Sequence, residues 1–337
     1  PALQRQRLIQ NLAHGGGLDY YLIGRLDNHE DRSGFPAVKE VFRLHDRYSE
    51  IYAHTRPVGQ VAVVRSRDQS GDEFRGWYRI LAENHFLFDV LDAGNLDRAD
   101  LSAYHAVILP DLRRWPGARD ESLRAYLENG GRVIATGSTG WVDGDREPVD
   151  TSLLPILSGA RLKNVHPNQR SAYFRLSGRP GFPGLQRTDL VWMDHSYWEI
   201  EYPEGWTPHL KRIPPHPYGP PERCYYEEIT EDPGLVELRS ESGECRAVYL
   251  PWLPAACYQR QGFRNTAALL LDLLESWLDQ PVIEGNLPPQ VEVSVLRREN
   301  GDLLLHLVNL GGHFVTTFHE PTPVYELNLV LPLDDAM

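Results

Sequence analysis

A run of β-branched residues ends in a serine-containing glycine turn at residues 132–141, "RVIATGSTGW". Many α/β hydrolases hold a nucleophilic serine in such a turn, in the pattern Gly-x-Ser-x-Gly, where the leading glycine lets strand and helix approach closely. Here Thr136 occupies the leading position, although Gly140 fits the trailing one. A nucleophilic serine also requires a histidine base and an acid that orients the base. Two interpretations follow: Ser138 is a nucleophile, or, as the residue types favour, it is a turn residue.

A polar loop, "GRLDNHEDRSGF" at residues 24–35, follows an apolar run and precedes a helix expected to begin near Pro36. If the apolar run is a strand of a (β/α)8 barrel, the loop lies on the face that carries barrel active sites. Asp27, His29 and Asp31 are therefore candidate substrate-binding residues. The alternative is a solvated loop that caps the following helix.

An aromatic stretch, "VWMDHSYWEIEYPEGW" at residues 191–206, interleaves rings with carboxylates. Rings stack on the C–H faces of sugars, and carboxylates bind hydroxyl groups. This chemistry predicts a sugar site that includes Trp192, His195 and Trp198. The alternative is ordinary strand patterning, because apolar and acidic residues alternate from residue 198 to residue 202.

Other chemistries lack support in the sequence. We find no His-x-His or His-Glu-x-x-His motif and no Gly-x-Gly-x-x-Gly or phosphate-binding loop, so we expect no metal and no nucleotide cofactor. A net charge of −13 argues against a nucleic-acid surface and against an anionic membrane surface. No apolar run approaches the roughly 18 residues of a membrane helix.

The two ends of the chain and its cysteines bear on its setting. The first residues lack the apolar core of a signal peptide. Three cysteines without metal-type spacing favour a reducing, cytoplasmic location. The chain opens on Pro1 rather than on methionine, which fits removal of an initiator methionine or excision from a longer protein.

The central part of the chain alternates strands and helices. Strands are expected at residues 60–66, 88–94, 106–110 and 132–136, and helices at 74–85 and 120–131. Apolar strands separated by helices indicate a parallel sheet that is covered on both faces. This doubly wound, flavodoxin-like sheet is completed by a strand at 245–252 and a helix at 265–278. Residues 150–240, rich in proline, glycine and aromatic residues, are predicted to be an insertion.

The flanking parts are of a different kind. Residues 1–56 are predicted to form a helix, an apolar strand at 18–24, the polar loop and a one-faced helix from Pro36 onward. One such strand cannot bury both of its faces, so it must complete a larger sheet or barrel. Residues 290–310 alternate with period two around the Asn300-Gly301 turn, and residues 324–333 add a strand. This pattern predicts a small antiparallel β domain.

Two segments, "YRILAENHFLFDVLDAGNLDRADLSAYHAVILPDLRR" and "LRAYLENGGRVIATG", resemble the middle, trimerisation domain of family 42 β-galactosidases and related glycoside hydrolases. That domain has a class I amidotransferase-like fold without the amidotransferase nucleophile. The segments "AHGGG" and "FPAVKEVFRLHDRYSEIY" resemble the end of the barrel that precedes it. The resemblance implies a barrel end at residues 1–56, the trimerisation domain at 57–282 and the β domain at 283–337.

The resemblance also has a consequence for catalysis. Retaining glycosidases need two carboxyl groups about 5–5.5 Å apart, and in the resembled family both glutamates lie on barrel strands earlier than any present here. No residue of this sequence inherits either role. We therefore expect this chain to be a portion of a glycoside hydrolase that binds carbohydrate and forms a wall of the active site. We also expect it to self-associate, with a trimer as the expected oligomer. The alternatives are a non-catalytic carbohydrate-binding or assembly protein and, third, a Ser138-dependent hydrolase.

Overall fold

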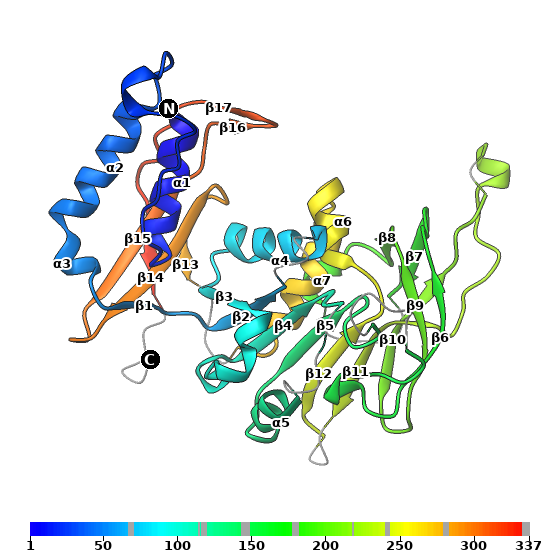
Figure 1. Cartoon of the computed structure of the whole chain (residues 1–337). Coiled ribbons are helices and arrows are strands. Elements are labelled where there is room, and N and C mark those ends of the chain that lie inside the picture. Colours follow the sequence, from blue (N-terminus) through cyan, green and yellow to red (C-terminus); the bar gives the residue numbers. More distant parts are fainter. Residues whose placement is uncertain are drawn as a thin grey trace. The chain divides into compact units, whose positions relative to one another are not determined.

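The computed structural model describes residues 1–66, 71–113, 115, 120–142, 149–176, 182–217, 219–239, 243–278 and 283–331. The chain forms two compact units (Figure 1). Unit 1 comprises Pro1–Gly59, Leu81–Asp89 and Pro281–Met337, and unit 2 comprises Gln60–Ile80 and Val90–Gln280.

Unit 2 is built on parallel strands, as the sequence predicts. β2 (Val61–Arg65), β4 (Ala106–Pro110), β5 (Val133–Thr136) and β12 (Cys245–Leu250) lie next to one another in that order and pair in parallel. β3 (Phe88–Asp92) lies beside β2 at the edge of the sheet. The predicted α/β fold class with a doubly wound parallel sheet is thus confirmed.

Helices cover both faces of these strands. α6 (Pro254–Gln261) and α7 (Arg264–Glu275) lie on one face with α4 (Asp72–Glu83), and α5 (Asp120–Glu128) lies on the other (Figure 1). Adding a Cβ to Gly76 of α4 would place it 1.9 Å from the Ala255 carbonyl oxygen, so α4 and α6 cross closely at this glycine. The central strands β2, β4 and β5 are buried along almost their whole length.

The predicted insertion extends this sheet rather than standing apart from it. β11 (Pro233–Arg239), β10 (Thr207–Ile213), β7 (Ala172–Arg175) and β8 (Leu190–Met193) follow β12, each antiparallel to its neighbour. β6 (Arg161–His166) and β9 (Tyr197–Glu201) pair separately. Short 3-10 helices complete the unit: η2 (Ala93–Arg98), η3 (Leu101–Ala103), η5 (Pro155–Leu157), η6 (Pro183–Leu185) and η7 (Pro221–Arg223).

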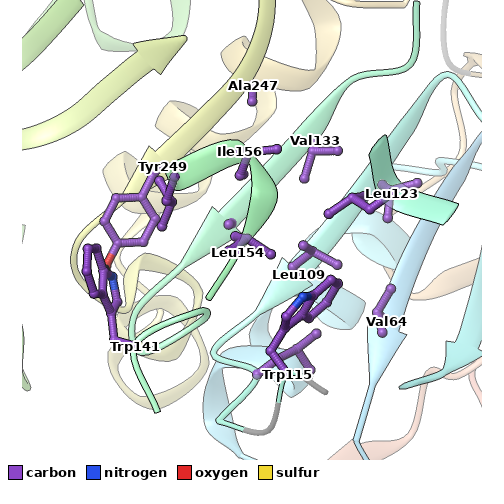
Figure 2. Close-up of a cluster of buried hydrophobic side chains, with 14 of the residues drawn as sticks. Val64, Leu109, Trp115, Leu123, Val133, Trp141, Leu154, Ile156, Ala247 and Tyr249 are labelled. Carbon is purple, nitrogen blue, oxygen red and sulfur yellow. Dashed lines mark hydrogen bonds between the residues drawn. The ribbon is translucent and has the colours of Figure 1, made fainter. Parts of the chain in front are cut away.

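One core of unit 2 lies between the α5 face of the sheet and residues 154–157. Figure 2 shows side chains from successive strands meeting there, among them Val64, Leu109, Val133 and Tyr249. The Trp141 Nε1–H donates to the Tyr249 hydroxyl (2.8 Å), which donates to the Gly137 carbonyl oxygen (2.7 Å). The polar atoms of these buried rings are therefore satisfied inside the core.

Unit 1 combines helices with a small antiparallel sheet. α1 (Ala2–Ala13), η1 (Leu26–Asn28), α2 (Phe35–Arg47) and α3 (Ser49–Tyr52) precede β1 (Thr55–Pro57). β14 (Val291–Arg298) lies between β1 and β15 (Leu303–Asn309), which follows it through the predicted Asn300-Gly301 hairpin. Shorter pairs are β13 (Glu284–Gly285) with β18 (Leu329–Val330) and β16 (His313–Phe314) with β17 (Thr317–Phe318).

Two predictions for unit 1 need correction. The strand expected at residues 18–24 does not form, since none of the described strands pairs with this segment, and Tyr21 and Ile23 are 84% and 83% exposed. The strand expected at 324–333 is reduced to Leu329–Val330, and residues 332–333 lie outside the described residues. Backbone pairing, rather than an apolar run alone, decides whether a strand exists.

Candidate functional site

The serine turn lies at the carboxyl end of β5, beside the end of β4. The backbone N–H and the hydroxyl of Ser138 both donate to Asp111 Oδ1, at 2.8 and 2.6 Å. Asp111 directly follows β4, and its backbone has a positive φ of 50°. Burial raises the pKa of Asp111, and the two hydrogen bonds from Ser138 oppose that rise. The Ser138 hydroxyl is thus committed to a buried carboxyl group.

Gly137 is required by the geometry of this turn. Its φ is +60°, and an added Cβ would lie 2.4 Å from Leu253 Cδ2. Its N–H donates to the carbonyl oxygens of Leu250 and Trp252, at 3.0 and 3.1 Å. The turn is therefore tied to the end of β12 as well as to β4.

A second buried carboxyl group, that of Glu73, lies in the first turn of α4. Its Oε2 accepts a hydrogen bond from the Ala256 N–H at the start of α6 (2.8 Å). Burial raises the pKa of Glu73 to about 8, because this hydrogen bond offsets only part of the desolvation, and the charge of Asp111 adds to the rise. Glu73 acts as a cap for α6.

Reactive groups in this region are held in unreactive forms. Burial raises the pKa of the Cys257 thiol to about 12, which disfavours the thiolate that a cysteine nucleophile needs. Ser138 is 3% exposed, and its side-chain hydrogen bond in the described part of the chain is to Asp111 rather than to a histidine. These observations support the turn-residue interpretation of Ser138.

Two of the predicted sugar-binding residues lie near the end of α6. The edge of Trp192 packs on Phe263, with ring centroids 4.9 Å apart, and Phe263 is 47% exposed. His195 Nδ1 lies 2.9 Å from an Arg260 guanidinium nitrogen, and Arg260 also pairs with Asp72. The structure therefore brings Trp192 and His195 to the same segment, residues 260–263.

The imidazole of His195 is held in a neutral state. Burial and the neighbouring Arg260 charge lower the pKa of His195. Its backbone has a positive φ of 80°, which is uncommon for a residue with a side chain. The Nδ1 of His195 is engaged by Arg260 and its Nε2 is buried, so Arg260 and Asp72 are the polar side chains here that a hydroxylated ligand would meet.

Trp198 has a different environment from Trp192 and His195. It is 8% exposed and belongs to the same core cluster as Trp141 and Tyr249. Its strand β9 pairs with β6, with Trp198 opposite Val165. Its ring therefore offers little surface to a ligand. For Trp198, ordinary strand patterning over residues 198–202 is a better interpretation than a sugar site.

The polar loop lies in unit 1, and its contacts are local. Asp27 is exposed and pairs with Arg25 at 3.2 Å. Asp31 Oδ1 accepts from the Ser33 N–H at 2.9 Å, and hydrogen bonds from Ser33 lower the pKa of Asp31. His29 meets the edge of Phe35 with ring centroids 6.0 Å apart. These local contacts fit the alternative interpretation, a solvated loop that precedes α2.

Several residues of these clusters escaped the sequence analysis. A residue that follows a parallel strand lies at the edge where α/β proteins bind ligands, so Asp111 was available from this rule. Glu73, Arg260 and Phe263 carry no local motif, and only the packing of α4 and α6 brings them into place.

No group of three or more His, Cys, Asp or Glu side chains suited to a metal ion occurs among the described residues. Within the same residues, no helix has the length and apolar character needed to cross a membrane.

The chain is similar to known glycoside hydrolases in sequence over part of its length and in fold over most of it. Residues 54–166 match the family model of the β-galactosidase trimerisation domain. No curated protein matches the chain. Among solved structures, an α-L-fucosidase isoenzyme 2 from Paenibacillus thiaminolyticus has 20% identity and a TM-score of 0.66, over 91% of this chain and 46% of that chain.

Two β-galactosidase structures are similarly related. The enzyme from Bacillus circulans sp. alkalophilus has 18% identity and a TM-score of 0.66, over 93% of this chain and 46% of that chain. The enzyme from Rahnella sp. R3 has 16% identity and a TM-score of 0.63, over 92% of this chain and 47% of that chain. The chain thus spans less than half the length of each, and it shares their fold over that part. The resemblance expected from the sequence is confirmed, because residues 54–166 match the model of the β-galactosidase trimerisation-domain family.

Proposed function

We propose that this chain is the C-terminal portion of a glycoside hydrolase related to family 42 β-galactosidases, and that it serves self-association and forms one wall of an active site. The match of residues 54–166 to the trimerisation domain carries the proposal. In this proposal residues 1–56 end a barrel, residues 57–282 form the trimerisation domain and residues 283–337 form the β domain.

Exposed apolar side chains support the assignment of residues 1–56. Tyr21 and Ile23 are largely exposed, and α2 and α3 carry four partly exposed apolar residues: Phe42, Leu44, Tyr48 and Ile51, at 38–41%. Exposed apolar surface of this kind suits a place that another part of a protein covers. A larger barrel is the cover that this proposal requires.

In the proposal, the catalytic carboxyl groups belong to that barrel. Glu73 and Asp111, two of the buried carboxyl groups of unit 2, hydrogen-bond to the start of α6 and to the serine turn, and so already have structural roles. We assign carbohydrate contact first to Trp192 and His195, and secondarily to Asp27, His29 and Asp31. Trp198 is the weakest of the set because it is buried. The three cysteines are free thiols, which suits the cytoplasmic location proposed here.

The alternative is a carbohydrate-binding or assembly protein without turnover. The half-exposed ring of Phe263, which packs edge to face with Trp192, favours it. The two proposals make different predictions for the gene. A hydrolase requires an upstream sequence that encodes a barrel with two carboxylates at strand ends, and the alternative does not.

Three measurements test the proposal. Sedimentation velocity of the 337-residue chain across a concentration series is expected to reveal a trimer, and a monomer at every concentration would overturn the self-association role. Sequencing the gene upstream of the Pro1 codon is expected to reveal a barrel with paired carboxylates, and its absence would leave the non-catalytic alternative. Titration calorimetry with lactose, on the chain and on Trp192→Ala, measures carbohydrate binding, with Trp206→Ala as the matched control.

A further inference from the structure

The connection between β10 and β11, residues 214–232, is far longer than the antiparallel strands require. Hairpin loops commonly have about 2–5 residues. Figure 1 shows this segment, in yellow-green, extending away from the sheet of unit 2 with η7 near its tip. We call residues 214–232 the arm. Long loops within compact domains are usually functional.

The arm is held to its own unit only near its base. The Thr230 N–H donates to the Arg212 carbonyl oxygen (2.8 Å), and His216 packs on Tyr173 with ring centroids 5.9 Å apart. Between residues 217 and 229, the hydrogen bonds of the described residues are local ones within the η7 turn. Tyr225 and Tyr226 are 57% and 41% exposed.

This composition suits intermolecular contact. Five prolines lie in the arm, at positions 214, 215, 217, 220 and 221, and they restrict its backbone before any contact forms. Less conformational entropy is then lost on docking. Tyrosine is enriched among the residues that dominate binding energy at protein interfaces. A pair of exposed tyrosines on a stiffened segment therefore suits the role of an anchor for a partner.

The charge of the arm indicates what that partner presents. The arm carries five acidic residues and one arginine. Glu222, Glu227 and Glu228 are exposed and form no ion pair within the described part of the chain, whereas Glu231 pairs with Lys211 at the base. A surface with exposed, unpaired cations would complement the arm.

Cations of this kind lie on this same chain, next to the two glutamates of β9, Glu199 and Glu201, whose strand pairs with β6. Residues 161–187, which we call the basic segment, contain no aspartate or glutamate, although the chain has a net charge of −13. The segment comprises β6, β7 and η6. Its exposed side chains that form no ion pair among the described residues are Arg161, Lys163, Arg170, Arg175 and Arg187.

We propose that the arm of one copy docks on the basic segment of a second copy of this chain. The inference rests on the proposed self-association and adds the surfaces that would produce it. Because each copy carries both an arm and an acceptor, the contact is heterologous, and a closed ring satisfies every arm. The acidic arm and the basic segment attract each other, which favours encounter and fixes the orientation of docking.

The test neutralises the arm in the full chain. Glu222→Gln, Glu227→Gln and Glu228→Gln together are expected to weaken self-association at least about tenfold, measured by sedimentation equilibrium at low salt. The matched control changes three exposed glutamates elsewhere in unit 2, Glu121→Gln, Glu128→Gln and Glu204→Gln, and should associate like the wild type. Circular dichroism and melting temperature verify that both variants fold.

Charge reversal makes the test specific for this pair of surfaces. Arg170→Glu, Arg175→Glu and Arg187→Glu in the basic segment should also abolish association, and adding Glu222→Lys, Glu227→Lys and Glu228→Lys to the same chain should restore it. Association of the arm variant at wild-type strength would overturn the inference and leave the proposed self-association standing. A monomeric wild type would overturn both.

Discussion

The two units differ in how completely they cover their apolar side chains. In unit 2, Trp77, Trp141 and Trp252 are fully buried, and the central parallel strands are buried almost throughout. In unit 1, Tyr21 and Ile23 are more than four-fifths exposed, although they belong to a run as apolar as the strands of unit 2.

The difference shows that strand formation depends on neighbours. β2, β4, β5 and β12 satisfy one another's backbone groups, and helices then cover both faces. Residues 18–24 have no described strand beside them, so neither their backbone nor their side chains gain from an extended ladder. Unit 2 thus completes its own interior, whereas unit 1 presents a surface that suits further protein.

The largest expected effect contrasts one residue from each unit. Trp252→Ala removes a fully buried ring that packs on Phe174 at 4.9 Å and donates to the Gly234 carbonyl oxygen. We expect it to lower the free energy of unfolding by about 3–5 kcal/mol. Tyr21→Ala should change it by less than about 0.5 kcal/mol, because an exposed side chain loses few contacts.

Urea unfolding of the 337-residue chain, followed by tryptophan fluorescence and circular dichroism, measures both values. An equal loss for Tyr21→Ala and Trp252→Ala would break the comparison, since it would mean that residues 18–24 are already covered in solution. Self-association of the chain must be held constant by working at one protein concentration.

The second prediction concerns the charge of Glu73, a carboxyl group in the interior of unit 2. The pKa of Glu73 is raised to about 8 in the folded chain, from an ordinary value of 4.5. Between these values the folded state keeps a proton that the unfolded state releases, so this group's contribution to stability falls as pH rises from about 4.5 to about 8. Glu73→Gln removes this titration. The unfolding free energy of the variant should therefore rise relative to that of the wild type by about 2–4 kcal/mol as the pH rises across this range.

The measurement is the difference in unfolding free energy between wild type and variant at pH 5 and at pH 8.5. The control Glu128→Gln, on the exposed side of α5, should show no such growth. A constant difference for Glu73→Gln would mean that the carboxyl group is solvated in the folded chain.

Sequence patterns predicted the parallel half of unit 2 well, because each of its strands is a short apolar run bounded by a helix or a turn. The helices α4, α5 and α7 and the β14–β15 hairpin were likewise expected where they occur. The pairing of β11, β10, β7 and β8 onto the same sheet was not, since strand order is set by contacts between segments distant in sequence.

The candidate site was predicted less well than the fold. Trp192 and His195 were identified by residue type, yet their partners Arg260, in the last turn of α6, and Phe263, between α6 and α7, are brought near only by tertiary packing. Trp198 has the same residue type as Trp192 but faces the core, and its alternation with Glu199 and Glu201 already allowed for this outcome.

The smallest effect concerns the serine turn and asks whether a polar group in the interior of unit 2 is structural. Ser138→Ala removes the 2.6 Å hydrogen bond to Asp111 and leaves that carboxyl group with the Ser138 N–H. We expect a loss of about 1–2 kcal/mol in unfolding free energy, the range for a hydrogen bond to a partly desolvated polar group. Ser158→Ala, on an exposed residue, should be neutral within about 0.5 kcal/mol. Any esterase or amidase activity of the chain should be the same in Ser138→Ala as in the wild type. Loss of such an activity at unchanged stability would instead identify Ser138 as a nucleophile, and the carboxyl edge of the parallel strands would then be a reactive site rather than part of a completed interior.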